Sequence, residues 1–177
     1  MTALDRNHTW TLTSLPAGRS AIKSPWVFKR ILKRDGSIER FKGRLVTKGY
    51  SQRSGVDYDQ TYSPVVKYDS LRVILAMAAA EDMKLFQLDV TITFLHGILK
   101  EEIYLEQPEG HVATGQEKKL YRLQKSLYGL KQASRNWNEK FGDFLTKFGF
   151  VPSNADSCVY TLRRGGERTV VAIWVDD

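Results

Sequence analysis

Two β-prone runs joined by an Asp-Gly dipeptide place the strongest local constraint on how this chain can fold. Residues 26–32 form the first run and residues 38–50 the second, with Asp35-Gly36 between them. Aspartate followed by glycine suits a tight two-stranded turn, because both residues tolerate positive φ angles. We therefore expect a β-hairpin in the amino-terminal third of the chain.

This hairpin also carries a high density of positive charge. Residues 1–53 contain 12 Lys and Arg against 3 Asp and Glu, whereas the rest of the 177-residue chain contains 15 and 17. Trp26, Phe28 and Phe41 are interleaved with the cations, as on many surfaces that contact phosphates and bases. Two interpretations stay open, a polyanion contact or an exposed hairpin whose lysines block edge pairing. The cations are Lys29, Arg30, Lys33, Arg34, Arg40, Lys42, Arg44 and Lys48.

Composition excludes several classes of protein. The single Cys158 rules out an internal disulfide, and His8, His96 and His111 lie too far apart in sequence to suggest a zinc site. The first 20 residues lack a secretory pattern, and the longest apolar run, near residues 73–80, is too short to cross a bilayer. The 42% of hydrophobic residues predict a globular protein, and we expect Cys158 to lie in its core. Since the sequence shows neither a secretory nor a membrane-spanning pattern, we expect the protein to lie inside the cell without membrane contact.

The remaining patterns alternate between helix and strand. Asp69 or Ser70 can cap a helix that runs to about residue 83, and a short strand is expected near residues 10–12. Further strands are expected at residues 84–90, 103–106 and 120–123. The clearest helix covers residues 134–148, because aromatic residues recur there at helical spacing and Gly149 supplies a stop. We expect its aromatic stripe, which includes Trp137 and Phe148, to lie in the core.

Two of the expected strands end in carboxylates. The strand at residues 84–90 delivers Asp89, and a second hairpin around Gly165-Gly166 has an arm at residues 169–175 that runs into Asp176-Asp177. An acidic residue at a strand end is usually only solvated, so neither signal alone identifies a site.

Several motifs in a fixed order resemble those of one known family. The chain resembles the reverse transcriptase region of a copia-type LTR retrotransposon polyprotein over nearly its whole length. The motifs are Trp26-Val27-Phe28-Lys29, Asp35-Gly36-Ser37-Ile38-Glu39-Arg40-Phe41-Lys42, Arg44-Leu45-Val46-Thr47-Lys48-Gly49-Tyr50, Tyr62-Ser63-Pro64-Val65-Val66, Gln87-Leu88-Asp89-Val90, Glu102-Ile103-Tyr104-Leu105-Glu106-Gln107-Pro108-Glu109-Gly110, Ser126-Leu127-Tyr128-Gly129-Leu130-Lys131-Gln132 and Trp174-Val175-Asp176-Asp177.

The resemblance implies an α+β fold of the right-hand polymerase type. The basic hairpin would form most of the fingers, with residues 1–66 and part of 105–130, and a small antiparallel sheet backed by helices would form the palm, with residues 67–104 and 131–177. A thumb and a ribonuclease H domain are not recognisable, so we expect an incomplete reverse transcriptase domain that is inactive as an isolated chain.

The resemblance also implies a chemistry and its site. An RNA-directed DNA polymerase transfers a nucleotidyl group from a dNTP to a primer 3′-hydroxyl with two Mg²⁺ ions, or Mn²⁺ in their place. The implied catalytic and metal-binding residues are Asp89, Asp176 and Asp177. Nucleotide contacts are implied for Arg44, Lys48, Phe94 as a gate against the ribose 2′-hydroxyl, Tyr128 and Gly129. Contacts to template or primer are implied for Lys29, Arg30, Lys42, Lys131 and Arg135.

The same resemblance implies partners, a location and some departures. The partners are an RNA or DNA template with its primer, dNTPs, and the integrase and ribonuclease H of a Pol polyprotein, in a cytoplasmic virus-like particle or the nucleus. This chain has Thr91-Ile92-Thr93 where the family commonly shows Lys-Thr-Ala, Ser134 for Pro and Trp174 for Tyr. Two alternatives remain, a noncatalytic nucleic-acid-binding module and a decayed transposon remnant without activity.

Overall fold

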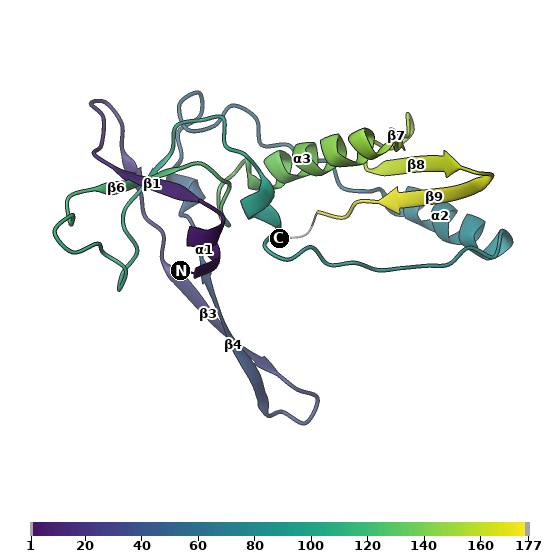
Figure 1. Cartoon of the computed structure of the whole chain (residues 1–177), viewed down its shortest axis with the longest axis horizontal. Helices are drawn as coiled ribbons and strands as arrows, with labels where there is room; N and C mark the ends of the chain where they lie inside the picture. Colours follow the sequence, from purple (N-terminus) through teal and green to yellow (C-terminus); the bar gives the residue numbers. More distant parts are fainter. Residues whose placement is uncertain (1, 176–177) are drawn as a thin grey trace.

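The computed structural model describes residues 2–175 and shows an α+β arrangement (Figure 1). A mixed four-stranded sheet has the order β1-β6-β5-β2, with β1 at Trp10–Thr13, β6 at Leu120–Leu123, β5 at Tyr104–Leu105 and β2 at Ala21–Ile22. The β1–β6 and β5–β6 pairs are antiparallel and the β2–β5 pair is parallel. Leu105 and Leu123 are fully or almost fully buried, so this sheet anchors one part of the core.

The predicted basic hairpin is confirmed. Strands β3 (Trp26–Leu32) and β4 (Ile38–Leu45) pair antiparallel and project away from the rest of the molecule (Figure 1). At the turn, Asp35 Oδ1 accepts hydrogen bonds from the Ser37 backbone N–H at 2.9 Å and from Ser37 Oγ at 2.6 Å. Gly36 has a φ of 83°, a left-handed conformation that glycine adopts in tight turns without steric strain.

The second predicted hairpin is also confirmed, within a three-stranded antiparallel sheet, but its second arm ends at Ala172 and not at the predicted residue 175. Strands β7 (Val151–Pro152), β8 (Val159–Arg164) and β9 (Glu167–Ala172) follow one another in space as in sequence. Gly165 and Gly166 both have positive φ, as a two-residue hairpin loop requires. Cys158, just before β8, is completely buried, as expected.

Helix α3 (Ala133–Phe148) begins one residue before its predicted start and ends where expected. Gly149 has a φ of 102°, and its N–H donates to the Thr146 carbonyl at 3.0 Å. The prediction of a wholly buried aromatic stripe is wrong. Trp137 is buried, but Phe144 and Phe148 are each 56% exposed and continue a ladder of stacked rings along the helix surface.

The amino terminus of helix α2 (Tyr68–Ala80) is capped by a residue far away in the sequence and not by a residue of the helix itself. The predicted caps Asp69 and Ser70 lie inside the first turn. Asp156 supplies the cap instead, since its Oδ2 accepts the Lys67 N–H at 2.9 Å. At the other end Glu81 pairs with Arg168 of β9, so α2 is tied to the β7–β9 sheet at both ends.

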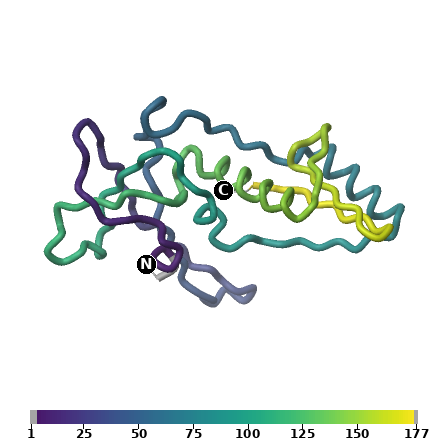
Figure 2. Tube along the Cα trace, turned by 45° about the horizontal axis from the view of Figure 1, so that its top comes forward, coloured from purple at the N-terminus to yellow at the C-terminus, as the bar shows by residue number. Residues whose placement is uncertain are grey.

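The prediction of a strand at residues 84–90 is wrong. This segment is extended, but no strand within residues 2–175 pairs with it, and Leu85, Phe86 and Leu88 are 64%, 82% and 87% exposed. Figure 2 shows it as the teal tube that returns from α2 toward the 3₁₀-helix η2 (Thr93–His96). Ile92, directly before η2, has a φ of 59°, a strained value for a β-branched residue.

The remaining short elements are α1 (Thr2–Arg6), which the sequence did not indicate, and the 3₁₀-helix η1 (Gly49–Ser51). No helix within residues 2–175 combines the length and the apolar character needed to cross a bilayer.

Candidate nucleotide and nucleic-acid interface

Three segments far apart in sequence meet at Tyr128. The guanidinium carbon of Arg44, in β4, lies 5.5 Å from the centre of the Tyr128 ring. The ring of Phe94, in η2, meets Tyr128 edge-on with a centroid distance of 4.7 Å. The fold therefore brings three of the five predicted nucleotide-binding residues into one cluster, which we call the Tyr128 cluster: Arg44, Phe94 and Tyr128.

The backbone on either side of this cluster is docked at very short range. The Thr47 N–H donates to the Tyr128 carbonyl at 2.7 Å. A Cβ atom at Gly49 would lie 1.9 Å from the Gly129 carbonyl oxygen, and a Cβ at Gly129 would lie 2.1 Å from the Thr47 carbonyl oxygen. Both positions therefore need glycine, and this contact holds Lys48 beside Gly129. Lys48 is half-buried and its ammonium has no partner within residues 2–175.

Phe94 is more enclosed than a residue that contacts a sugar would be. It is 4% exposed and belongs to the main core, whereas Tyr128 and Arg44 are half-buried. Tyr128 is therefore the more accessible of the two aromatic residues in the cluster, and the Arg44 guanidinium lies over its ring.

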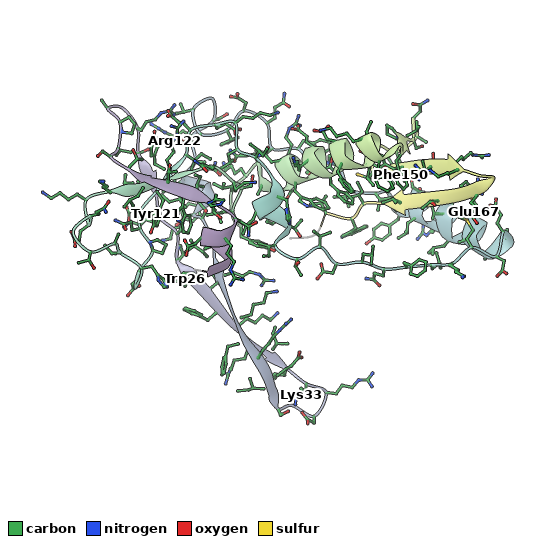
Figure 3. All side chains as sticks on the ribbon, viewed as in Figure 1. Trp26, Lys33, Tyr121, Arg122, Phe150 and Glu167 are labelled. Carbon is green, nitrogen blue, oxygen red and sulfur yellow. The ribbon has the colours of Figure 1, made fainter. Side chains whose placement is uncertain are left out.

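Within residues 2–175, no carboxylate forms an ion pair with a cation of the basic hairpin. The described residues, 2–175, contain seven ion pairs, and the eight hairpin cations named above take part in none of them. Figure 3 shows side chains projecting from the hairpin between Trp26 at its base and Lys33 near its tip. Unpaired cations on a projecting element are available to an external polyanion.

Strand register separates the hairpin cations onto two faces. Lys29 lies opposite Lys42, and Val27 lies opposite Arg44, so one face is basic. Arg30 lies opposite Phe41 on the other face, which also carries Phe28. Phe28 and Phe41 are 79% and 76% exposed. Direct opposition of Lys29 and Lys42 is unfavourable unless an anion lies between them.

Lys131 and Arg135 both make internal contacts. Lys131 Nζ donates to the Tyr58 hydroxyl at 3.0 Å and lies 4.6 Å from the centre of that ring. This hydrogen bond lowers the pKa of the Tyr58 phenol, with a smaller coulombic contribution from the same ammonium. Arg135 pairs with Glu139 at 2.9 Å and donates to the Tyr62 carbonyl at 3.2 Å. Lys131 lies in the turn before α3, whereas Arg135 lies within the helix.

Two buried glutamines were not predicted from the sequence, and each follows one of the closely packed glycines, Gly49 and Gly129, by three residues. Gln52 and Gln132 are 5% and 0% exposed and are hydrogen-bonded to each other. No local pattern marks them, because a lone Gln in a turn is ordinarily solvated.

The expected metal site is described only in part. Asp89 is exposed, and its carboxylate has no partner within residues 2–175, where no group of three or more His, Cys, Asp or Glu side chains could hold a metal ion. Asp176 and Asp177 lie outside the described residues. The coil after β9, residues 173–175, runs back toward η2 in both Figure 1 and Figure 2. A free carboxylate such as that of Asp89 fits the hard-oxygen preference of magnesium.

Comparisons with known proteins identify the family of this chain. A family model described as "Reverse transcriptase (RNA-dependent DNA polymerase)" matches residues 7–177. The chain is 46% identical over its whole length to the retrovirus-related Pol polyprotein from transposon TNT 1-94 of Nicotiana tabacum. It is 40% identical, over 97% of its length, to the corresponding polyprotein from transposon RE1 of Arabidopsis thaliana.

A more distant relative is the Transposon Ty1-BL Gag-Pol polyprotein of Saccharomyces cerevisiae, 33% identical over 90% of this chain. The chain covers 13%, 12% and 8% of these three polyproteins, respectively. No solved structure matches it. The extent of the family match and the identity to the plant polyproteins establish that this chain belongs to the reverse transcriptase family, in the group found in Pol polyproteins of copia-type retrotransposons.

Proposed function

We propose that this chain binds the incoming dNTP and the template–primer of an RNA-directed DNA polymerase. The observation that carries the proposal is the Tyr128 cluster, in which Arg44, Phe94 and Tyr128 converge from three separate segments. The Arg44 guanidinium can bond two phosphate oxygens at once, and Lys48 adds a second cation that no carboxylate within residues 2–175 neutralises. The half-buried Tyr128 ring offers an aromatic surface to a base or sugar.

We assign the parts of the chain to a right-hand polymerase on the same basis. Residues 1–66 and part of 105–130, with the projecting hairpin, form the fingers; residues 67–104 and 131–177, with α2, α3 and the β7–β9 sheet, form the palm. Support comes from the separate projection of β3 and β4 in Figure 1. Template and primer would contact Lys29, Arg30 and Lys42, with Lys131 and Arg135 ordering the loop at residues 53–62.

Nucleotidyl transfer would take place beside Asp89. We propose Asp89, Asp176 and Asp177 as ligands of two magnesium ions, or manganese in their place. The assignment of Asp89 is supported by its exposure and by the absence of a partner for its carboxylate among residues 2–175. When bound, the ions activate the primer 3′-hydroxyl and stabilise charge on the leaving pyrophosphate. The partners would be the integrase and ribonuclease H of a Pol polyprotein, in a virus-like particle or the nucleus.

Photolabelling tests the nucleotide site directly. The 177-residue chain would be irradiated with an azido derivative of dATP and digested, and we expect the label on peptides that contain Tyr128 or residues 44–48. Arg44→Ala should weaken saturable labelling roughly tenfold, since it removes a charge-assisted contact. Arg164→Ala makes the same charge change on the exposed β8–β9 hairpin and should have no effect. Labelling that is insensitive to Arg44→Ala would refute the site.

Primer extension tests the chemistry. In a Pol polypeptide that carries this region, Asp89→Asn should abolish magnesium-dependent extension on an RNA template while RNA binding persists. The unpaired charge of the hairpin by itself also fits a noncatalytic nucleic-acid-binding module. That second function predicts salt-dependent RNA binding without specific photolabelling at Tyr128.

A further inference from the structure

Two buried carboxamide side chains, those of Gln52 and Gln132, join the segment after β4 to the turn before α3. Gln52 Nε2 donates to Gln132 Oε1 at 3.0 Å. Gln132 Nε2 donates to the Asp57 carbonyl at 2.9 Å, and Gln52 Oε1 accepts the Lys131 N–H at 2.8 Å. The two side chains thus form a bridge that also engages backbone groups on both segments.

The bridge lies next to the contact that carries the Tyr128 cluster. Gln52 is three residues after Gly49, and Gln132 is three residues after Gly129, where the two backbones come so close that neither position has room for a Cβ. The hydrogen bond from Thr47 to the Tyr128 carbonyl lies at the other side of the same contact. Residues 47–52 and 128–132 are therefore docked along their length, with the amide bridge at one end and the Tyr128 cluster at the other.

Carboxamides give this interface a register that apolar side chains of the same volume would not. Apolar contacts are non-directional, so two packed leucines would tolerate a shift of one segment along the other. Amide hydrogen bonds fix both distance and orientation, and leaving a buried partner unsatisfied is unfavourable. A shift would break the Gln52–Gln132 bond and leave the Asp57 carbonyl and the Lys131 N–H without those partners.

Neither glutamine can contact substrate, because both are buried and their hydrogen bonds go to each other and to backbone groups. We propose that Gln52 and Gln132 are positioning residues for nucleotide binding. Their bridge fixes Thr47–Gly49 against Tyr128–Gly129, and this sets Arg44 over the Tyr128 ring. This inference rests on the nucleotide site proposed above.

A charge-introducing variant gives the first test. In Gln132→Glu a carboxylate replaces the donor that faces the Asp57 carbonyl. We expect photolabelling with the azido-dATP probe to weaken roughly tenfold at about pH 8. Burial raises the pKa of such a glutamate, so at about pH 5 the protonated carboxyl can donate to Asp57 and labelling should return toward the wild-type level. The wild-type chain, measured at both pH values, corrects for any intrinsic pH dependence.

A second variant keeps the test valid if Gln132→Glu does not fold. The double variant Gln52→Met, Gln132→Met keeps side-chain volume and adds no charge. We expect it to fold, to label several-fold more weakly, and to exchange the Thr47 amide hydrogen faster in hydrogen-exchange mass spectrometry. Gln124→Met, a change of the same type at an exposed position, should match the wild type in every measurement.

The outcomes separate the two proposals. If the wild-type chain labels at Tyr128 but the glutamine variants label and exchange like the wild type, with only a lower melting temperature, the positioning role is refuted and the nucleotide site stands. If the wild-type chain shows no specific label while the variants still accelerate Thr47 exchange, the bridge fixes the backbone but the nucleotide site is refuted. Unchanged exchange together with no label refutes both.

Discussion

Three glycine-to-alanine substitutions separate the backbone strain at Gly129 from the close contact it makes. Gly129 has a φ of 89°, and an added Cβ would lie 2.1 Å from the Thr47 carbonyl oxygen. Gly36 has nearly the same φ, 83°, but nothing within 4 Å of an added Cβ. Gly49 has no positive φ, yet its Cβ would lie 1.9 Å from the Gly129 carbonyl oxygen. Gly129 thus combines both effects, Gly36 shows strain alone and Gly49 shows close contact alone.

The expected losses of unfolding free energy follow from these geometries. Alanine at Gly36 incurs only the left-handed conformation, about 1 kcal/mol. Alanine at Gly49 forces two backbones apart and weakens the Thr47–Tyr128 hydrogen bond, about 2–3 kcal/mol. Alanine at Gly129 combines both effects, about 3–4 kcal/mol. Because the obstructing atoms are backbone, no side-chain rotation can relieve the contact.

Urea unfolding followed by tryptophan fluorescence would measure the three losses, with the transition midpoint converted through the slope m. The expected order is Gly36→Ala, then Gly49→Ala, then Gly129→Ala. Equal destabilisation at Gly36 and Gly129 would show that the segments are not docked at the distances given above. In that case the placement of Arg44 over Tyr128 would also lose its basis.

Three further predictions concern separate regions. Burial alone would raise the pKa of Asp156, but hydrogen bonds from Ser70 and from the N–H groups of Lys67 and Cys158 lower it overall. The stability that Asp156 contributes as the cap of α2 is therefore present above pH 3.8 and is lost as the pH falls through its folded pKa. Asp156→Ala should lower the unfolding free energy by about 1 kcal/mol at neutral pH, measured by urea unfolding. The same variant should no longer show this loss of stability in acid. Replacing both Lys29 and Lys42 by Gln should reduce the slope of log K against log salt for RNA binding by about 2, whereas an unchanged slope would place the phosphates elsewhere. Ile92→Asn, which suits the positive φ, should stabilise the chain by about 0.5–1 kcal/mol in urea, and a loss of stability would mean that Ile92 packing outweighs its strain.

Local signals allowed the sequence to predict the elements whose stability is local. The two hairpins and α3 are specified by Asp35-Gly36, Gly165-Gly166 and the stop at Gly149, all of which lie within the element that they define. The cap of α2 could not be predicted this way, because Asp156 is 89 residues from the N–H that it accepts. The segment at residues 84–90 has the composition of a strand, but pairing requires a neighbour that composition does not supply.

In the candidate site, too, the sequence identified residues but not the contacts between distant segments. The resemblance to reverse transcriptases identified Arg44, Phe94 and Tyr128, and the fold brings them together. It gave no indication that Lys131 would bond Tyr58, or that Gln52 and Gln132 would meet, because these contacts join segments that are more than 70 residues apart. Motifs identify residue types and order, whereas hydrogen-bond partners depend on the completed fold.

The unpaired segment at residues 84–90 has a consequence for the behaviour of the chain in concentrated solution. Its extended backbone pairs with no strand within residues 2–175, although the Val90 carbonyl accepts from Thr93 Oγ1. With Leu85, Phe86 and Leu88 exposed, this segment can pair with the same segment of a second molecule. Intermolecular pairing of this kind leads to aggregation as the concentration rises. Lys84 and Asp89 are the only charged residues in this segment, so little charge repulsion opposes intermolecular pairing. We therefore expect light scattering at high protein concentration to decrease when Leu88, whose side chain is 87% exposed, is replaced by lysine.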